Sequence, residues 1–242
     1  DAIEIIEQEL LRSGLDINLL NSVQDGLSRV VNTPLGASLG NLKLNQLGND
    51  RRISELSFDI PIAQKGNSIQ SLDVANAFNK DPHARFSTSY SESLKTLNIC
   101  SRGFLNGSID LVLTDRSDLK DARWWVVDWK SNWLGNRDEK DMSTDCGPMH
   151  YTNDAMEQQM LLHHYPLQAH IYLVALHRFL KWRLPNYSSS RHLGGYIYIF
   201  LRGIPSESEI INKNHETSIP GLIVEQAPLQ RVLELDRLLR DG

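Results

Sequence analysis

The pattern of hydrophobic and polar residues predicts several helices and strands along the chain. Apolar residues recur at helical spacing over residues 1–32, which predicts two helices, the second ending at Thr33-Pro34. Residues 53–62 alternate between apolar and polar positions, as in a half-buried strand. Residues 104–113 predict a strand with a glycine at 107, and residues 124–130 predict another that is apolar on both faces apart from Asp128 and Lys130. Continuous apolar strands of this kind are typical of the middle of a covered sheet.

The remaining segments predict more helices than strands. Helical patterns cover residues 153–164, 166–183 and 228–240, and weaker ones cover 69–78 and 89–97; residues 195–201 predict a strand. The polar stretch 132–152 contains the charged run 137–141 and predicts a loop. Helices and strands alternate too irregularly for a barrel. We therefore expect an α/β fold of the mixed α+β kind, with a central mixed sheet flanked by helices.

Composition narrows the class of protein. The 242 residues carry a formal net charge of -5 and are 40% hydrophobic, which indicates a globular protein rather than a disordered tail. The longest apolar runs fall far short of the roughly 20 residues of a membrane span. Residues 1–11 carry acids and no basic segment, so they do not indicate a secretory signal. Two isolated cysteines argue against a disulfide framework, a cysteine zinc site or an iron–sulfur cluster. We expect a cytoplasmic protein and, since the chain opens on Asp1, a piece of a longer one.

Three charged residues on the central strands are candidates for chemistry. Asp110 ends the motif Gly-Ser-Ile-Asp, and after seventeen intervening residues the chain reads Asp128-Trp129-Lys130. Side chains two apart on a strand point the same way, so Asp128 and Lys130 share a face. If the two strands pair, two carboxylates and an ammonium converge, and hard oxygen ligands suit Mg²⁺. The alternative is a strand-end ion pair with Asp110 capping a turn.

A second candidate lies on the long helix predicted over 166–183. Gln168 and Tyr172 are four residues apart and share one face of a helix that is otherwise apolar nearly all round. They could address a substrate, or they could be polar groups satisfied within the core.

A basic and aromatic surface is the third candidate. Residues 158–206 contain no Asp or Glu, whereas they include the cations Arg178, Lys181, Arg183, Arg191 and Arg202 and, among their aromatic residues, Tyr165, Tyr172, Trp182 and Tyr187. This combination suits a groove for single-stranded nucleic acid. The alternative is a solvated helix face with core aromatics.

Four motifs in this order closely resemble the C-terminal nuclease domain of the RecB family, the β subunits of exodeoxyribonuclease V. They lie at residues 103–112, 127–135, 165–178 and 194–203. The resemblance implies a PD-(D/E)xK fold, as in restriction endonucleases, and a single nuclease domain over 1–242. Its parts would be a helical segment (1–52), the nuclease core (53–203) and a tail with a helix (204–242).

The resemblance also implies roles for individual residues. Asp110 and Asp128 would be ligands of Mg²⁺, with Mn²⁺ or Ca²⁺ able to occupy the site, and the Trp129 carbonyl would be a further ligand. Lys130 would be the catalytic lysine.

Three weaker assignments follow from the same resemblance. Glu55 matches the family's upstream acid, while Gln168 and Tyr172 match its Q-xxx-Y motif. The family also uses a histidine ligand upstream of the first acid, but no histidine precedes His83 here. We expect that ligand to lie outside this sequence.

The expected function is therefore that of a metal-dependent deoxyribonuclease domain in a bacterial helicase-nuclease that repairs double-strand breaks. Its implied partners are single-stranded DNA fed from a helicase, the RecC and RecD subunits, and RecA. The rival interpretation is an inactive nuclease-like module that guides DNA or docks proteins. An iron–sulfur nuclease of the AddB type would need four cysteines and fails on that count.

Overall fold

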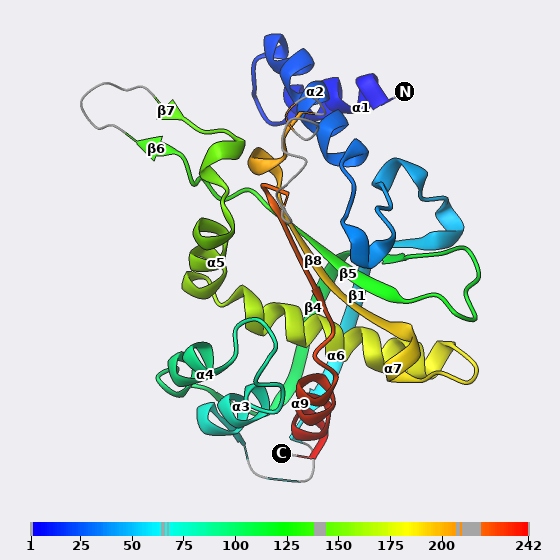
Figure 1. Cartoon of the computed structure of the whole chain (residues 1–242), viewed down its shortest axis with the longest axis vertical. Coiled ribbons are helices and arrows are strands. Elements are labelled where there is room, and N and C mark those ends of the chain that lie inside the picture. The colour runs from blue at the N-terminus through cyan, green and yellow to red at the C-terminus, as the bar shows by residue number, and fades with distance from the viewer. Residues whose placement is uncertain are drawn as a thin grey trace. The chain divides into compact units, whose positions relative to one another are not determined.

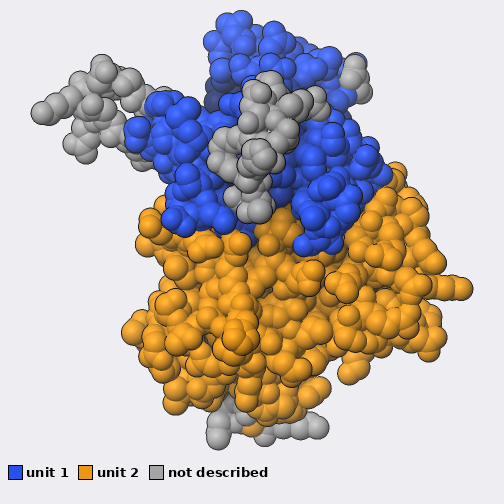
Figure 2. All heavy atoms as spheres, in the orientation of Figure 1, with its two compact units in different colours: residues 1–47, 129–156, 199–223 blue, residues 48–128, 157–198, 224–242 orange. Residues whose placement is uncertain are grey.

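Two compact units, each built from separate stretches of the chain, make up the computed structural model (Figure 2). The structure describes residues 2–63, 66, 68–137, 144–206, 209 and 219–241, so most of the charged run at 137–141 lies outside the described residues. Unit 1 comprises residues 1–47, 129–156 and 199–223, and unit 2 comprises residues 48–128, 157–198 and 224–242.

A five-stranded mixed sheet, most of which belongs to unit 2, confirms the expected mixed α+β class (Figure 1). Its order is β1-β4-β5-β8-β9, and β4 pairs antiparallel with both β1 and β5. The strands are β1 (Arg52–Ile62), β4 (Gly103–Thr114), β5 (Trp124–Lys130), β8 (Leu193–Phe200) and β9 (Leu222–Gln226). The expected strands match β1, β4, β5 and β8, whereas the short β9 was not predicted.

The helices of unit 2 pack around this sheet. Ile60 and Ile62 of β1 are buried, as their alternation predicts, and α9 packs against β1, α3 and α6. The helices are α3 (Ser71–Phe78), α4 (Thr88–Lys95), α6 (Tyr165–Arg183), α7 (Ser189–His192) and α9 (Leu229–Asp241). A two-stranded sheet joins β2 (Ile69–Gln70) to β3 (Cys100–Ser101), and the turn η4 (Asn49–Arg51) precedes β1. All the expected helices in this unit form, and α7 is additional.

Unit 1 begins with the two helices expected over residues 1–32. These are α1 (Ala2–Arg12) and α2 (Leu20–Asn32), with the short turn η1 (Ile17–Leu19) between them capped by the Asp16 carboxylate. The connection after α2 contains only the turns η2 (Ala37–Leu39) and η3 (Leu44–Gln46).

The polar stretch 132–152 is not one uninterrupted loop, which corrects the expectation. It contains the paired strands β6 (Asn136–Arg137) and β7 (Thr144–Asp145) and the turn η5 (Pro148–His150). Tyr151 joins the two ends of this stretch, since its buried hydroxyl donates to the Asn132 carbonyl at 2.7 Å. The helix α5 (Asn153–Leu162) follows and continues into unit 2, and the turn η6 (Leu201–Gly203) follows β8. None of the described helices is long and apolar enough to span a membrane.

The guanidinium of Arg231, at the start of α9, is fully buried in unit 2. It donates to the carbonyls of Phe78, Asp81 and Arg85 at 3.0, 3.0 and 3.2 Å and lies 4.7 Å from the Phe78 ring. The Asp81 carboxylate in turn accepts from the Arg231 backbone N–H at 2.8 Å, which satisfies one of the free amides of the first helical turn. One side chain therefore fixes the segment after α3 to the start of α9.

His170 of α6 completes this buried cluster. Its Nδ1 donates to the Pro166 carbonyl at 2.6 Å, so its Nε2 is free to accept from Arg231 at 3.3 Å. Burial and then the charge of Arg231 lower the pKa of His170 to about 3. The imidazole is neutral in the folded protein at every pH near neutrality.

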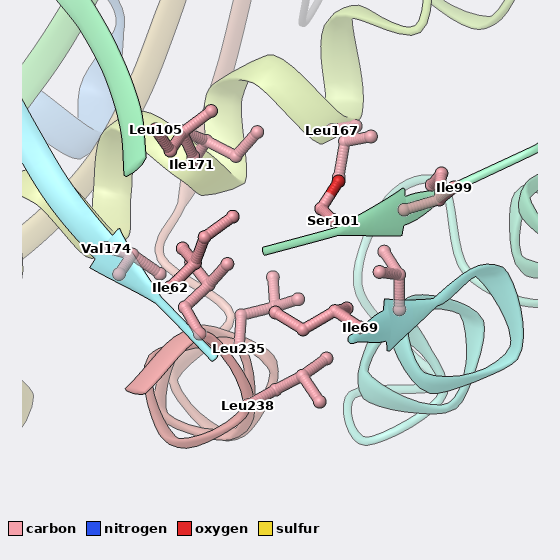
Figure 3. A pocket seen from close by; sticks show the side chains of 12 residues that line it. Ile62, Ile69, Ile99, Ser101, Leu105, Leu167, Ile171, Val174, Leu235 and Leu238 are labelled. Atoms are coloured by element: carbon pink, nitrogen blue, oxygen red, sulfur yellow. The ribbon is translucent and has the colours of Figure 1, made fainter. Parts of the chain in front are cut away.

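An apolar cavity of about 190 Å³ separates α9 from part of the sheet in unit 2 (Figure 3). Figure 3 shows Ile62 of β1, Leu105 of β4, Val174 of α6 and Leu235 of α9 around this space. Nearly all of its lining is aliphatic, so it offers few hydrogen-bond partners to a polar molecule. The cavity is therefore poorly suited to polar chemistry.

Replacing Arg231 by Met should lower the free energy of unfolding by about 3–5 kcal/mol, because three carbonyl groups and Glu225 lose a buried cationic partner. The matched control is Arg237→Met on the same helix, whose exposed ion pair with Glu234 should be worth less than about 1 kcal/mol. Urea denaturation of both variants measures the difference. Equal stability losses would show that the buried cluster is not a structural anchor.

His170 should make the protein less stable in acid. Its pKa is lower in the folded than in the unfolded chain, so its contribution is complete above the unfolded value near 6.5 and is lost as pH falls toward 3. In His170→Asn, the free energy of unfolding should fall less steeply between about pH 6 and pH 4, by up to about 1.4 kcal/mol per pH unit. The exposed His83→Asn is the control. An unchanged slope in His170→Asn would contradict the neutral imidazole.

Candidate active site

The pairing of β1, β4 and β5 sets three acidic residues at one level of the sheet. Leu111 pairs with Val127, and continuing the same register by one residue sets Asp110 opposite Asp128. On the other side of β4, Ser54 of β1 pairs with Leu111, and Leu56 pairs with Ile109. Glu55 lies between Ser54 and Leu56 and therefore stands opposite Asp110 in the register. The expected convergence of Asp110 and Asp128 follows from this register.

Glu55 interrupts the regular ladder of β1. Its φ of 54° lies in the left-handed region, which few residues other than glycine adopt without cost. The side chain is exposed. Among the described residues, no group of three or more His, Cys, Asp and Glu side chains is arranged to hold a metal ion. The structure therefore places Asp110 and Asp128 opposite each other in the sheet, and beside them Glu55 has a strained backbone.

Burial differs between the two central carboxylates. Asp128 is 4% exposed, whereas Asp110 is half-buried. Lys130 is also half-buried and follows Asp128 by two residues within β5, so strand alternation directs both side chains to the same side of that strand. Trp129, whose carbonyl is the further expected ligand, lies between them in β5.

The two polar residues of α6 are joined to each other by a hydrogen bond. Gln168 donates through Nε2 to the Tyr172 hydroxyl at 2.9 Å, and its Oε1 faces the Tyr198 hydroxyl of β8 at 3.0 Å. Tyr198 is fully buried and also lies 3.1 Å from the Tyr165 carbonyl. The Gln168 amide is therefore held in one orientation by groups on both sides.

Tyr172 lies within the electrostatic field of both carboxylates. Burial, then the charge of Asp128, and also that of Asp110, raise its pKa, although the bond from Gln168 acts in the opposite direction. Burial and the charge of Asp128 likewise raise the pKa of Tyr198. Both phenols are neutral, and the structure brings Gln168, Tyr172 and the two aspartates into one region of unit 2.

Tyr198 is the member of this network that the sequence did not single out. It stands in the run Tyr196-Ile197-Tyr198-Ile199-Phe200, where every residue is buried. Such a run predicts only a core strand. The available signal was the pair of tyrosines at alternate positions of this strand, together with the lone Gln168 in a mostly apolar helix.

The basic surface expected over residues 158–206 is only partly present. Arg178 is paired with Asp236 at 2.6 Å and Arg191 with Asp121 at 2.5 Å, because acids from other segments fold against this stretch. In unit 1, Arg202 donates to the Ser131 carbonyl and lies 5.9 Å from the Trp133 ring. Lys181 and Arg183, at the end of α6, are exposed.

The aromatic residues of that stretch are also mostly internal. The Tyr187 hydroxyl is 2.9 Å from His177 Nδ1, and the Tyr165 ring stacks on Tyr198 at 5.8 Å between centroids. Trp182 differs from them, because it is 76% exposed.

Comparison with known proteins shows which proteins the chain is similar to. No family model matches the chain. RecB, a subunit of the RecBCD enzyme, is 35% identical over 219 residues in Mycobacterium tuberculosis, which covers 87% of this chain and 18% of that protein. RecB of Haemophilus influenzae is 32% identical over 92% of this chain, and RecB of Escherichia coli is 31% identical over 84%.

The chain spans a small part of these relatives, namely 15% of the length of each of the last two proteins. The similarity nevertheless extends over most of this chain and includes both central strands and α6. The chain is therefore a RecB-type domain, homologous to a limited part of the RecB subunits.

Proposed function

We propose that this domain hydrolyses phosphodiester bonds in DNA and depends on a divalent metal ion. The observation that carries the proposal is the register of β4 and β5, which sets Asp110 opposite Asp128 with Lys130 two residues further along. The hydrogen-bonded pair of Gln168 and Tyr172 lies in the field of these carboxylates. Homology to RecB supports a nuclease in preference to an unrelated hydrolase.

The two aspartates fit Mg²⁺ as ligands. They are hard oxygen donors from adjacent strands, and Mg²⁺ in proteins is often held by one or two carboxylates while it keeps several waters. Asp110 and Asp128 would hold the ion, with the Trp129 carbonyl and Glu55 as further candidates; Mn²⁺ or Ca²⁺ suits the same donors. When bound, such an ion polarises a phosphoryl oxygen and lowers the pKa of water.

Lys130 supplies positive charge on the same side of β5 as Asp128. The phosphate in hydrolysis gains negative charge as water attacks, and an ammonium placed beforehand stabilises that charge without having to reorganise. Its nearness along the strand to Asp128 also lowers the cost of holding a carboxylate that is 4% exposed.

Gln168 determines which way the Tyr172 hydroxyl points. Because the Gln168 Nε2 donates to the phenol oxygen, that oxygen acts as an acceptor there and its own proton is directed elsewhere. We infer that this proton is donated to an oxygen of the bound phosphate. Tyr198 contributes indirectly, since its contact with the Gln168 Oε1 keeps the amide from turning over.

The proposal extends to a longer RecB-type protein that would contain this domain. Its substrate would be single-stranded DNA delivered by a helicase, in double-strand break repair and recombination. Its partners would be RecC and RecD subunits and RecA, and it would act in the bacterial cytoplasm. These assignments rest on the family resemblance.

The 242-residue chain with Mg²⁺ or Mn²⁺ should cut single-stranded DNA. Asp128→Asn and Lys130→Met should each slow cutting by about 10²-fold or more, because the first removes a carboxylate ligand of the metal and the second removes positive charge at the phosphate. Initial rates on a labelled strand measure this, with chelation by EDTA as the metal-free control. Cleavage by Asp128→Asn at the rate of the unmodified chain would overturn the site. If the unmodified chain does not cut DNA either, the result would favour the inactive DNA-guiding module.

Tyr172→Phe and Gln168→Ala should lower the cleavage rate, by up to about 10²-fold, more than they lower thermal stability. The first removes the hydroxyl donor aimed at substrate, and the second removes the amide that orients this donor. Tyr172→Phe keeps the ring contact with Phe58, whose centroid lies 5.9 Å away. The control is Tyr187→Phe, which removes a hydroxyl bonded to His177 in the same unit. A large shift in melting temperature with normal turnover would mean that the pair only satisfies the core.

A further inference from the structure

A groove of about 300 Å³ runs along the outer strand of the sheet in unit 2. One wall is residues 56–61 of β1, and the other is formed by Ala175, Arg178, Phe179 and Trp182 of α6. Phe58 belongs to the groove and also makes an edge-to-face contact with Tyr172, with 5.9 Å between ring centroids. The groove therefore begins beside the Gln168–Tyr172 pair.

Helical spacing places the site and the groove along one face of α6. Tyr172, Ala175, Phe179 and Trp182 follow one another at intervals of three, four and three residues, so they form a continuous stripe. At 1.5 Å per residue, Trp182 lies about 15 Å along the helix from Tyr172. A strand of a few nucleotides can cover that distance.

The far end of the stripe has the chemistry of a base-binding surface. Trp182 is 76% exposed and makes an edge-to-face contact with Phe179, with 6.4 Å between ring centroids. The Arg183 guanidinium lies over the Trp182 ring, 4.9 Å from its centroid. Lys181 and Arg183 are exposed beside it, whereas Arg178 inside the groove is neutralised by Asp236. Aromatic faces with flanking cations bind unpaired nucleotides because the ring stacks on a base while the cations attract the backbone.

An added protein strand fits this edge less well. A partner strand would need a regular row of backbone donors and acceptors along β1. Pro61 lacks an N–H, and the positive φ of Glu55 breaks the ladder near the other end. Asp59, an exposed acid of β1, also lines the groove. The regular part of the edge is therefore short.

We propose that the groove between β1 and α6 binds an unpaired nucleic-acid strand, with one base stacked on Trp182 while the strand continues toward Tyr172. The inference rests on the proposed function, which it extends by naming a contact outside the reacting phosphate. Trp182 is thus a positioning residue, which contacts one base of the bound strand. It takes no part in bond cleavage.

The test compares two labelled ligands of equal phosphate number, an oligothymidylate and an abasic strand, with EDTA present to prevent cleavage. Trp182→Ala should weaken binding of the oligothymidylate by about five- to hundredfold, because one stacked base is lost, and leave the abasic strand unaffected. Trp182→Phe should retain most of the affinity but lose quenching of tryptophan emission by the ligand. Leu72→Ala, which removes an apolar residue that is 56% exposed on α3, is the control and should change neither ligand.

Three results would overturn the proposal: unchanged affinity for both ligands in Trp182→Ala, equal losses for both ligands, or no binding by the unmodified chain. Cleavage assays separate this failure from failure of the nuclease assignment. If Asp128→Asn abolishes cutting while Trp182→Ala binds normally, the groove is wrong and the nuclease site stands. If Trp182→Ala weakens binding of bases but no protein cuts DNA, the groove stands and the nuclease assignment is wrong.

Discussion

The antiparallel register of β4 with its two neighbours is the constraint on which the candidate site depends. Side chains alternate between the faces of a strand, so a slip of one residue between β4 and β5 would move Asp128 to the opposite face from Asp110. Buried Leu111, Val112 and Leu113 on β4 pair with equally buried residues of β5, and a slip would disturb that core. The apolar halves of the strands therefore hold the two carboxylates in register.

The helix α6 joins this level of the sheet to the rest of unit 2. On one side, His170 lies against the Arg231 cluster, which fixes the segment after α3 and the start of α9. On another side, Gln168 and Tyr172 lie in the field of the aspartates. The helix is apolar nearly all round, and the polar side chains His170, Gln168 and Tyr172 each have a defined partner. Its position is determined by hydrogen bonds as well as by packing.

Much of the fold could be predicted because the patterns in question are local. Alternation in β1, the apolar runs at the end of β4 and in the first part of β5, and helical spacing in α6 each identify an element without reference to the rest of the chain. The prediction missed β9 and the pairing of β6 with β7, since these short strands are defined by their partners. The same limit explains the basic surface: Asp236 and Asp121, distant in sequence, neutralise Arg178 and Arg191.

For the site, the sequence was sufficient to predict which residues could take part, but it could not predict the surroundings of these residues in the fold. The spacing of Asp128 and Lys130 predicts a shared face, and the register sets Asp110 opposite. The left-handed backbone at Glu55 and the role of Tyr198 could not be predicted, because both depend on neighbouring strands and helices.

Charge balance links the site to its proposed substrate. A phosphodiester is negative, and two carboxylates on adjacent strands repel it at short range, the more so where burial lowers the effective dielectric constant. The raised pKa values keep Tyr172 and Tyr198 neutral, so these phenols add hydrogen bonds without adding negative charge. Lys130 supplies one positive charge against two negative ones. A phosphate therefore approaches this level of the sheet more favourably together with further positive charge, and a divalent cation between the carboxylates and the phosphate would provide it.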